Sequence, residues 1–218
     1  MIVRFIERLA AIKHINLMHD AKVYISKNVR ICCKPTSSII AYKGSSHIGY
    51  EFPESPPRAT YNKGVIAIDR GAIVEIHGPI LIAPGVYIHV CEGAKLVFKG
   101  ENCIAHNTSL IVGKYMEIGN NTSISWNVTL IDYDKRRFYT QDGKIAPTEA
   151  RPLILGSNCG LQMNVVVPKG IVVGDNTMVG ANTVLRRDVP GNSLVYQNPD
   201  LRIKKNITTG FQFLNNKM

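Results

Sequence analysis

The 218-residue sequence contains few charged and few aromatic residues, and its charge is unbalanced. Only 19% of the residues are charged and 7% are aromatic, whereas 45% are hydrophobic. A disordered chain shows the opposite balance, and a single-strand nucleic-acid binder needs aromatic residues interleaved with its basic ones. We therefore expect a packed protein with no nucleic-acid partner. The net charge of +10 favours a phosphorylated or acidic ligand, or an anionic surface.

Long apolar runs and paired cysteine motifs are also missing. No run approaches the roughly 18–20 apolar residues of a membrane-spanning helix, and Arg4, Glu7, Arg8 and Lys13 interrupt the N-terminus. The five cysteines are odd in number and show no Cys-x-x-Cys spacing, which argues against a disulfide framework or a four-cysteine zinc site. The sequence also contains no Walker or Gly-x-Gly-x-x-Gly phosphate loop. These absences predict a soluble, reduced, cytoplasmic protein.

A six-residue repeat organises the second half of the chain. Ten aliphatic residues recur at this spacing: Val112, Ile118, Ile124, Leu130, Leu155, Leu161, Val167, Val173, Val179 and Leu185. The residues two positions before them are apolar or small: Leu110, Met116, Thr122, Val128, Leu153, Cys159, Val165, Ile171, Thr177 and Thr183. Side chains two apart share one face of a strand, so each pair predicts a short strand with two inward residues.

The turns between these strands carry residues that tolerate unusual backbone angles. The corners Gly119–Asn121 and Gly174–Asn176 suit a positive φ. Three hexapeptides would close one triangular coil of about 18 residues, and stacked coils bury a continuous apolar column. A β-sandwich is the alternative, but its turns recur every 8–12 residues or so and not at a strict six. The pattern therefore predicts an all-β parallel β-helix.

The flanking segments divide the chain into three parts. Residues 1–64 are expected to hold a short N-terminal helix, marked by apolar residues at helical spacing, and an irregular leading segment. The helix stripe favours packing on the core or on a neighbouring subunit, with peripheral contact to an anionic membrane as the alternative. Residues 65–200 are expected to form the β-helix, with less regular strands up to residue 98, and residues 201–218 a basic tail.

One coil is interrupted by a long insertion. Leu130 and Leu155 lie 25 positions apart instead of six, so 19 residues are inserted, and we place the protruding loop at 132–150. Long loops on rigid scaffolds are often functional, although a solvated excursion is the alternative.

The segment before the insertion and the repeats after it resemble a known protein family. The segment SISWNVTLIDYD (123–134) and the repeats after it resemble the hexapeptide-repeat acyltransferases, in particular the maltose, serine and polysaccharide O-acetyltransferases. The resemblance covers roughly residues 65–205. It implies a left-handed β-helix, a homotrimer, and acetyl-CoA bound in a groove between subunits.

The resemblance also implies a general base. In similar polysaccharide-modifying enzymes the loop reads Asp-x-Asp-x-His, and the histidine takes the proton of the acceptor hydroxyl. Here Asp132 and Asp134 match, but Arg136 stands at the histidine position and cannot act as a base. We expect His106 to replace it, because counting back one 18-residue coil from Ile124 places it beneath the loop; Asp134 is the alternative.

The resemblance extends to the binding residues. It implies a saccharide acceptor contacted by Trp126, Asn127 and Tyr139. For acetyl-CoA it implies a backbone groove at Gly180, Ala181 and Asn182, with phosphate contacts from basic residues. The basic residues in question are Arg186, Arg202 and Lys204. A basic cap that blocks further stacking is the alternative for the last group.

Zinc is not expected from this resemblance. The histidine spacing of the γ-class carbonic anhydrases, which share the fold, occurs only at His14–His19, outside the repeats. The leading functional hypothesis is acetyl transfer from acetyl-CoA to a sugar hydroxyl of a polysaccharide or its precursor. The alternatives are an amino-sugar N-acyltransferase and, because of Arg136, a catalytically impaired trimeric β-helix that binds CoA or glycan.

Overall fold

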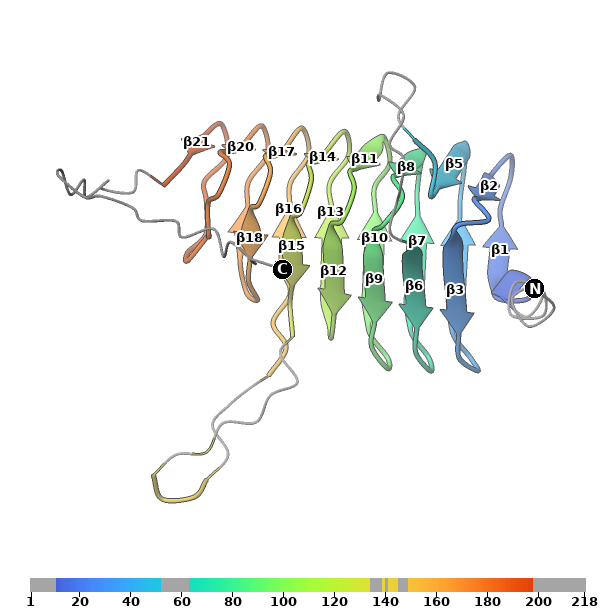
Figure 1. The fold of residues 1–218 in the computed structure, drawn as a ribbon, viewed down its shortest axis with the longest axis horizontal. Helices are drawn as coiled ribbons and strands as arrows, with labels where there is room; N and C mark the ends of the chain where they lie inside the picture. The colour runs from blue at the N-terminus through green and yellow to red at the C-terminus, as the bar shows by residue number, and fades with distance from the viewer. Residues whose placement is uncertain (1–10, 52–62, 134–138, 140, 145–148, 198–218) are drawn as a thin grey trace, which may run out of the picture.

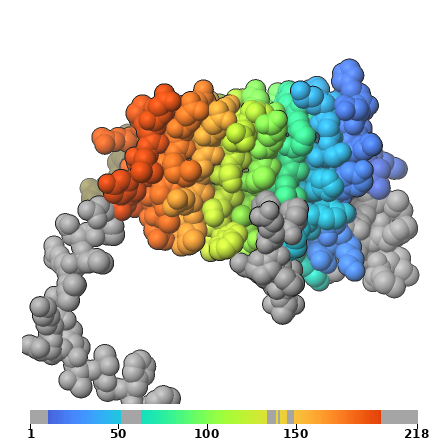
Figure 2. Space-filling model, turned by 90° about the horizontal axis from the view of Figure 1, so that it is seen from above, coloured from blue at the N-terminus to red at the C-terminus, as the bar shows by residue number. Residues whose placement is uncertain are grey.

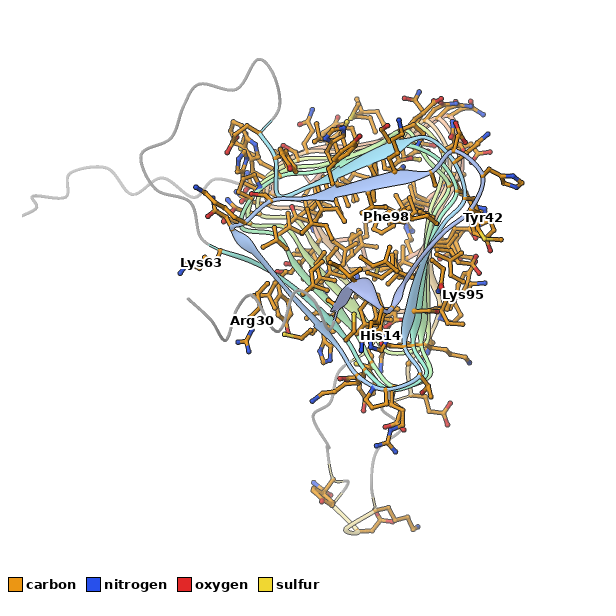
Figure 3. All side chains as sticks on the ribbon, turned by 90° about the vertical axis from the view of Figure 1, so that its right-hand side faces the viewer. His14, Arg30, Tyr42, Lys63, Lys95 and Phe98 are labelled. Atoms are coloured by element: carbon orange, nitrogen blue, oxygen red, sulfur yellow. The ribbon has the colours of Figure 1, made fainter. Side chains whose placement is uncertain are left out.

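The computed structural model describes residues 11–51, 63–133, 139, 141–144 and 149–197. Within these ranges the strands pair in parallel and stack into three sheets, which form the sides of a triangular, left-handed parallel β-helix (Figure 1, Figure 3). The chain passes from sheet A to sheet B to sheet C and back to sheet A in each coil. We call the three rows of turns between them the AB, BC and CA edges.

Each sheet contains one strand from successive coils. Sheet A contains β1 (Ile15–Leu17), β4 (Ser38–Ala41), β7 (Ile73–Ile76), β10 (Lys95–Phe98), β13 (Tyr115–Ile118), β16 (Leu153–Leu155) and β19 (Val172–Val173). Sheet B contains β2 (Lys22–Ile25), β5 (Ser45–Ile48), β8 (Ile80–Ile82), β11 (Asn102–Ile104), β14 (Ser123–Ile124), β17 (Gly160–Leu161), β20 (Met178–Val179) and β21 (Leu194–Val195). Sheet C contains β3 (Val29–Cys33), β6 (Gly64–Ile68), β9 (Tyr87–Val90), β12 (Ser109–Val112), β15 (Thr129–Ile131) and β18 (Val166–Val167).

The core is the apolar column predicted from the repeat. All twenty residues of the two six-residue series are buried, each at most 6% exposed. Phe98 lies inside the triangle in Figure 3, where Arg30 and Lys95 point outward. The pairing of β15 with β18 and of β16 with β19 is parallel, so the β-helix prediction is confirmed and the sandwich alternative is excluded.

The length of a coil decreases along the chain. Ile73 pairs with Lys95 at 22 positions, Lys95 with Tyr115 at 20, and Ile154 with Val172 at 18. Thr129 pairs with Val166, 37 positions away, which is one 18-residue coil plus the predicted 19-residue insertion. The insertion leaves the stack at the CA edge, between β15 and β16, and most of it lies outside the described residues.

The β-helix begins earlier than the sequence suggested. Strands β1 to β5, between Ile15 and Ile48, pair in register with later strands of the same sheets, as β3 does with β6. Figure 2 shows the coils as successive bands of colour along one continuous body. Residues 15–48 are therefore coils of the same solenoid and not an irregular leading segment; their irregular spacing of 23 and 24 positions hides them from a six-residue search.

Two predicted segments fall largely outside the described residues. The N-terminal helix was placed on residues of which only Ala11 and Ile12, both helical, are described. The basic tail, 201–218, is not described at all. Within the described residues, no helix is long and apolar enough to cross a membrane.

Asparagines line the AB edge. Asn121, Asn158, Asn176 and Asn192 all have positive φ, between 53° and 56°. Each one donates a side-chain hydrogen bond to the next along the edge, over 2.8, 3.1 and 3.2 Å. Asparagine tolerates this backbone region better than other residues with a Cβ atom, so the predicted positive-φ corners are confirmed, and their side chains form a ladder across four coils.

Candidate functional site

Six of the predicted site residues share the BC edge. The turns of this edge stack through backbone hydrogen bonds: the N–H of Asn127 donates to the carbonyl of His106, and that of Asn164 to Trp126. One coil further, the N–H of Asn182 donates to the carbonyl of Met163. The edge therefore brings into one row the following predicted residues: His106, Trp126, Asn127, Gly180, Ala181 and Asn182.

His106 lies on a different edge from the one expected. Ile104 pairs with Ile124, so the coil here has 20 residues and not 18, and His106 follows β11 at the BC edge. The loop at 132–150 begins on the CA edge. The placement of His106 beneath the loop is thus wrong, because Ile124, from which it was counted, lies in β14 of sheet B, whereas the loop leaves after β15 of sheet C.

His106 has an acidic partner that the sequence did not reveal. Its Nε2 lies 3.0 Å from Oε2 of Glu51, and the histidine is only 4% exposed. A carboxylate can only accept, so Nε2 donates the proton and the lone pair of the neutral ring lies on Nδ1. Glu51 follows β5 and begins the connection to β6, which crosses the same BC edge. A histidine oriented by a carboxylate is the arrangement of a general base.

Around this pair the edge is apolar and open. Trp126 and Met163 are 42% and 43% exposed and lie in the two coils that follow His106. Asn127 is exposed, with a φ of 57°. These side chains form an accessible flank beside a buried histidine, and an indole face is a surface on which a sugar ring can stack.

The predicted cofactor groove lies further along the same edge. The N–H of Gly180 donates to Val195, and that of Ala181 to the side chain of Gln162. Asn182 accepts a side-chain hydrogen bond from Asn164 over 2.9 Å. All three backbone N–H groups of the predicted groove are therefore used within the chain, so a bound acyl carrier would have to rely on other groups there or displace Gln162.

A surface depression with basic residues lies at the C-terminal end of the described coils. It is lined by residues 183–190 and 193–197, which include the exposed Arg186 and Arg187. Arg202 and Lys204 lie outside the described residues.

The first aspartate of the loop motif is a structural residue of the CA edge. Asp132 is fully buried, and its carboxylate accepts backbone hydrogen bonds from Gly113, from Lys114 over 3.0 Å and from Tyr115 over 2.8 Å. Burial raises the pKa of Asp132, and the backbone N–H groups oppose this rise. The carboxylate holds the preceding turn and is not presented to a substrate.

The remaining loop residues are not brought to this site by the described structure. Asp134 and Arg136 lie outside the described residues, and Tyr139 is 65% exposed. Within one chain, His106 and Asp132 occupy different edges of the triangle.

The repeat region matches a known family. Residues 152–187 match the profile described as bacterial transferase hexapeptide (six repeats). The repeats of this chain are thus similar to those of the hexapeptide-repeat acetyltransferases. Galactoside O-acetyltransferase of Escherichia coli is 27% identical to this chain over 148 residues, which cover 66% of this chain and 68% of the relative.

Two further proteins are similar to the chain. WcaF of Escherichia coli, provisionally assigned as a colanic acid biosynthesis acetyltransferase, is 25% identical over 62% of this chain and 65% of its own length. The solved structure of the polysialic acid O-acetyltransferase OatWY aligns over 94% of both chains with 17% identity and a TM-score of 0.47. The sequence alignments with the two Escherichia coli acetyltransferases extend beyond the matched repeats.

Proposed function

We propose that this chain transfers an acetyl group from acetyl-CoA to a hydroxyl of a sugar in a polysaccharide or its precursor. The similarity to galactoside O-acetyltransferase supports the reaction class and the sugar acceptor. The observation that carries the proposal is the His106–Glu51 pair, at 3.0 Å, on the edge that also holds Trp126. This edge combines a base, an acid that orients it and an aromatic flank.

The reaction needs one proton to be moved twice. His106 accepts the acceptor's hydroxyl proton at Nδ1 while that oxygen attacks the thioester carbonyl. The carbon–sulfur bond then breaks, and the imidazolium returns the proton to the leaving thiolate. Glu51 keeps its hydrogen bond to Nε2 and stabilises the imidazolium formed between the two steps. Because His106 is 4% exposed, this role requires the edge around Glu51 to open when the acceptor binds.

The C-terminal end of the protein offers basic residues to the phosphates of acetyl-CoA. We assign its phosphates to Arg186 beside the terminal depression, together with Arg202 and Lys204, because charge-assisted bonds to phosphate are strong. The acyl arm would then run along the BC edge past Gly180 towards His106.

We also propose a homotrimer. Large apolar side chains are exposed in the late coils, among them Met163 on the BC edge and Met178 and Leu194 on sheet B. Association of three copies by these faces would bury them.

The proposal is tested by thiol release from acetyl-CoA with a panel of neutral and amino sugars. We expect release that depends on neutral sugars, with loss in His106→Gln and no loss in His77→Gln, a histidine at the AB edge. Faster turnover of amino sugars would favour the N-acyltransferase alternative. A gain in Arg136→His together with an unchanged His106→Gln would return the base to the loop. Acetyl-CoA binding without acceptor-dependent release would favour the impaired binding protein.

A further inference from the structure

Three side chains with metal-binding groups converge on the outside of sheet C, away from the BC edge. Asp69 directly follows β6, and His89 and Cys91 belong to the end of β9 and the residue after it. One ligand atom from each lies within 4.8 Å of those of the other two. The closest pair is Nε2 of His89 and Oδ2 of Asp69, at 2.9 Å.

The backbone fixes this convergence. Strands β6 and β9 pair with Ala67 beside His89, and the N–H of Asp69 donates to the carbonyl of Val90. Cys91 is held from the other side, because its N–H donates to the carbonyl of Val112 over 2.7 Å. His89 therefore lies in a strand, and Asp69 and Cys91 are the first residues after two adjacent strands, where backbone hydrogen bonds fix both.

We propose that Asp69, His89 and Cys91 form a binding site for a divalent metal ion of the zinc type. A carboxylate, an imidazole and a thiolate are the ligand set of such borderline-soft ions. Tetrahedral zinc, with bonds of about 2.0–2.3 Å, holds its ligand atoms about 3.3–3.6 Å apart. The Asp69–His89 pair is 2.9 Å apart and all three ligand atoms lie within 4.8 Å of one another, so side-chain movements of roughly 1 Å bring them to these separations.

The degree of burial suits a site with an open position. Cys91 is 7% exposed, while the side chains of His89 and Asp69 are 18% and 33% exposed. The sulfur is thus shielded and the other two ligands face solvent, which leaves room for a water molecule as fourth ligand.

Proton balance sets the pH dependence of the site. On binding, the thiol of Cys91 loses its proton to solvent, and His89 carries its one remaining proton on Nδ1 while Nε2 binds the ion. Binding releases the thiol proton, so the affinity for the ion increases as the pH rises.

The bound ion would join two successive coils. Asp69 comes from the coil of β6 and the other two ligands from that of β9, so a ligand that binds only the folded chain stabilises this stack. No metal was expected from the sequence because it lacks the relevant histidine spacing and paired cysteines. Such motifs cannot detect residues that become neighbours only when two coils stack.

The test is a cobalt(II) titration of the metal-stripped, reduced full-length chain. We expect one equivalent to produce a thiolate-to-cobalt charge-transfer band together with the visible bands of four-coordinate cobalt, and zinc to displace it. Asp69→Asn, His89→Gln and Cys91→Ser should each weaken binding at least about tenfold, and Cys91→Ser should also remove the charge-transfer band.

Matched variants separate this site from nonspecific binding. Cys103→Ser on β11 and His77→Gln remove the same groups elsewhere and should bind cobalt as the unmodified chain does. Asp69→Asn preserves the side-chain shape, so it remains informative if Cys91→Ser fails to fold by circular dichroism. No binding, binding unaffected by the three substitutions, or a spectrum without a thiolate band would overturn the proposal and leave a simple Asp69–His89 ion pair. None of these measurements depends on acetyl transfer.

Discussion

His106 and Glu51 are 55 positions apart in the chain, yet Nε2 of the histidine lies 3.0 Å from Oε2 of the glutamate. The two residues meet because the connections after β5 and after β11 cross the same edge of the triangle. The contact gives a buried histidine a defined tautomer. It also assigns Glu51 a positioning role that can be separated from the role of the base.

Substitution Glu51→Gln should slow acetyl transfer without weakening substrate binding. The amide can still accept from Nε2 but does not stabilise the imidazolium, so we expect kcat to fall about 10- to 100-fold with KM for acetyl-CoA nearly unchanged. Glu51→Asp should restore part of the rate. Equal loss in KM, or no rescue by the aspartate, would indicate that Glu51 only holds the fold of this edge.

Removal of the Asp132 carboxylate should destabilise the fold. Three backbone N–H groups of Gly113, Lys114 and Tyr115 lose their acceptor in Asp132→Ala, so we expect a loss of about 2–3 kcal/mol in the free energy of unfolding measured with urea. Asp188→Ala is the control, because this exposed carboxylate accepts one bond, from the N–H of Val172. It should cost about 1 kcal/mol or less. Similar losses for the two variants would contradict a capping role for Asp132.

The asparagine ladder can be separated into backbone and side-chain contributions at Asn158. Its φ is 55°, and its side chain bonds to Asn121 and Asn176. Asn158→Ala strains the backbone and breaks the ladder, at a cost of about 2 kcal/mol, whereas Asn158→Gly relieves the strain and should recover about 1 kcal/mol. Thermal denaturation of both variants gives the comparison. If Asn158→Gly is no more stable than Asn158→Ala, backbone strain at positive φ does not contribute to the loss of stability.

The cluster around Glu75 should make stability depend on pH. The carboxylate lies 2.9 Å from Nζ of Lys95 and 3.0 Å from Nε2 of His77. Burial raises the pKa of Glu75, but the bonds and charges of Lys95 and His77 outweigh it, so the pKa lies below the ordinary value of 4.5. A lowered pKa in the folded state stabilises the fold above the unfolded value, and this contribution disappears as the pH falls through the folded one.

We therefore expect Glu75→Gln to lose about 1 kcal/mol near neutral pH and progressively less below pH 4.5. Urea unfolding of both proteins at a series of pH values measures the difference. A difference that stays constant into acid would mean that Glu75 acts by packing and not by its charge.

The inward residues could be predicted from the sequence because their signal is local. The burial of Leu161 and Val167, for example, follows from the six-residue period alone, without knowing which coils pack together. The edges could not be predicted in the same way. His106 shows this: Ile104, and not His106, pairs with Ile124, and the loop leaves the stack only after β15, one edge further along the coil.

Contacts across irregular coils leave no comparable pattern in the sequence. Glu51 precedes a connection whose length is unrelated to the repeat, so its partner appears only when β5 and β11 are seen in one sheet with β8 between them. The same holds for Asp69, which is brought to His89 by a 22-residue coil.

The central claim is that the BC edge performs acetyl transfer with His106 as base. Its most direct test is the initial rate of thiol release from acetyl-CoA with a neutral sugar acceptor, compared between the unmodified chain and His106→Gln at matched acetyl-CoA occupancy. The account predicts a rate at least about 100-fold lower in the variant, with His77→Gln unaffected. A His106→Gln rate equal to that of the unmodified chain would contradict it.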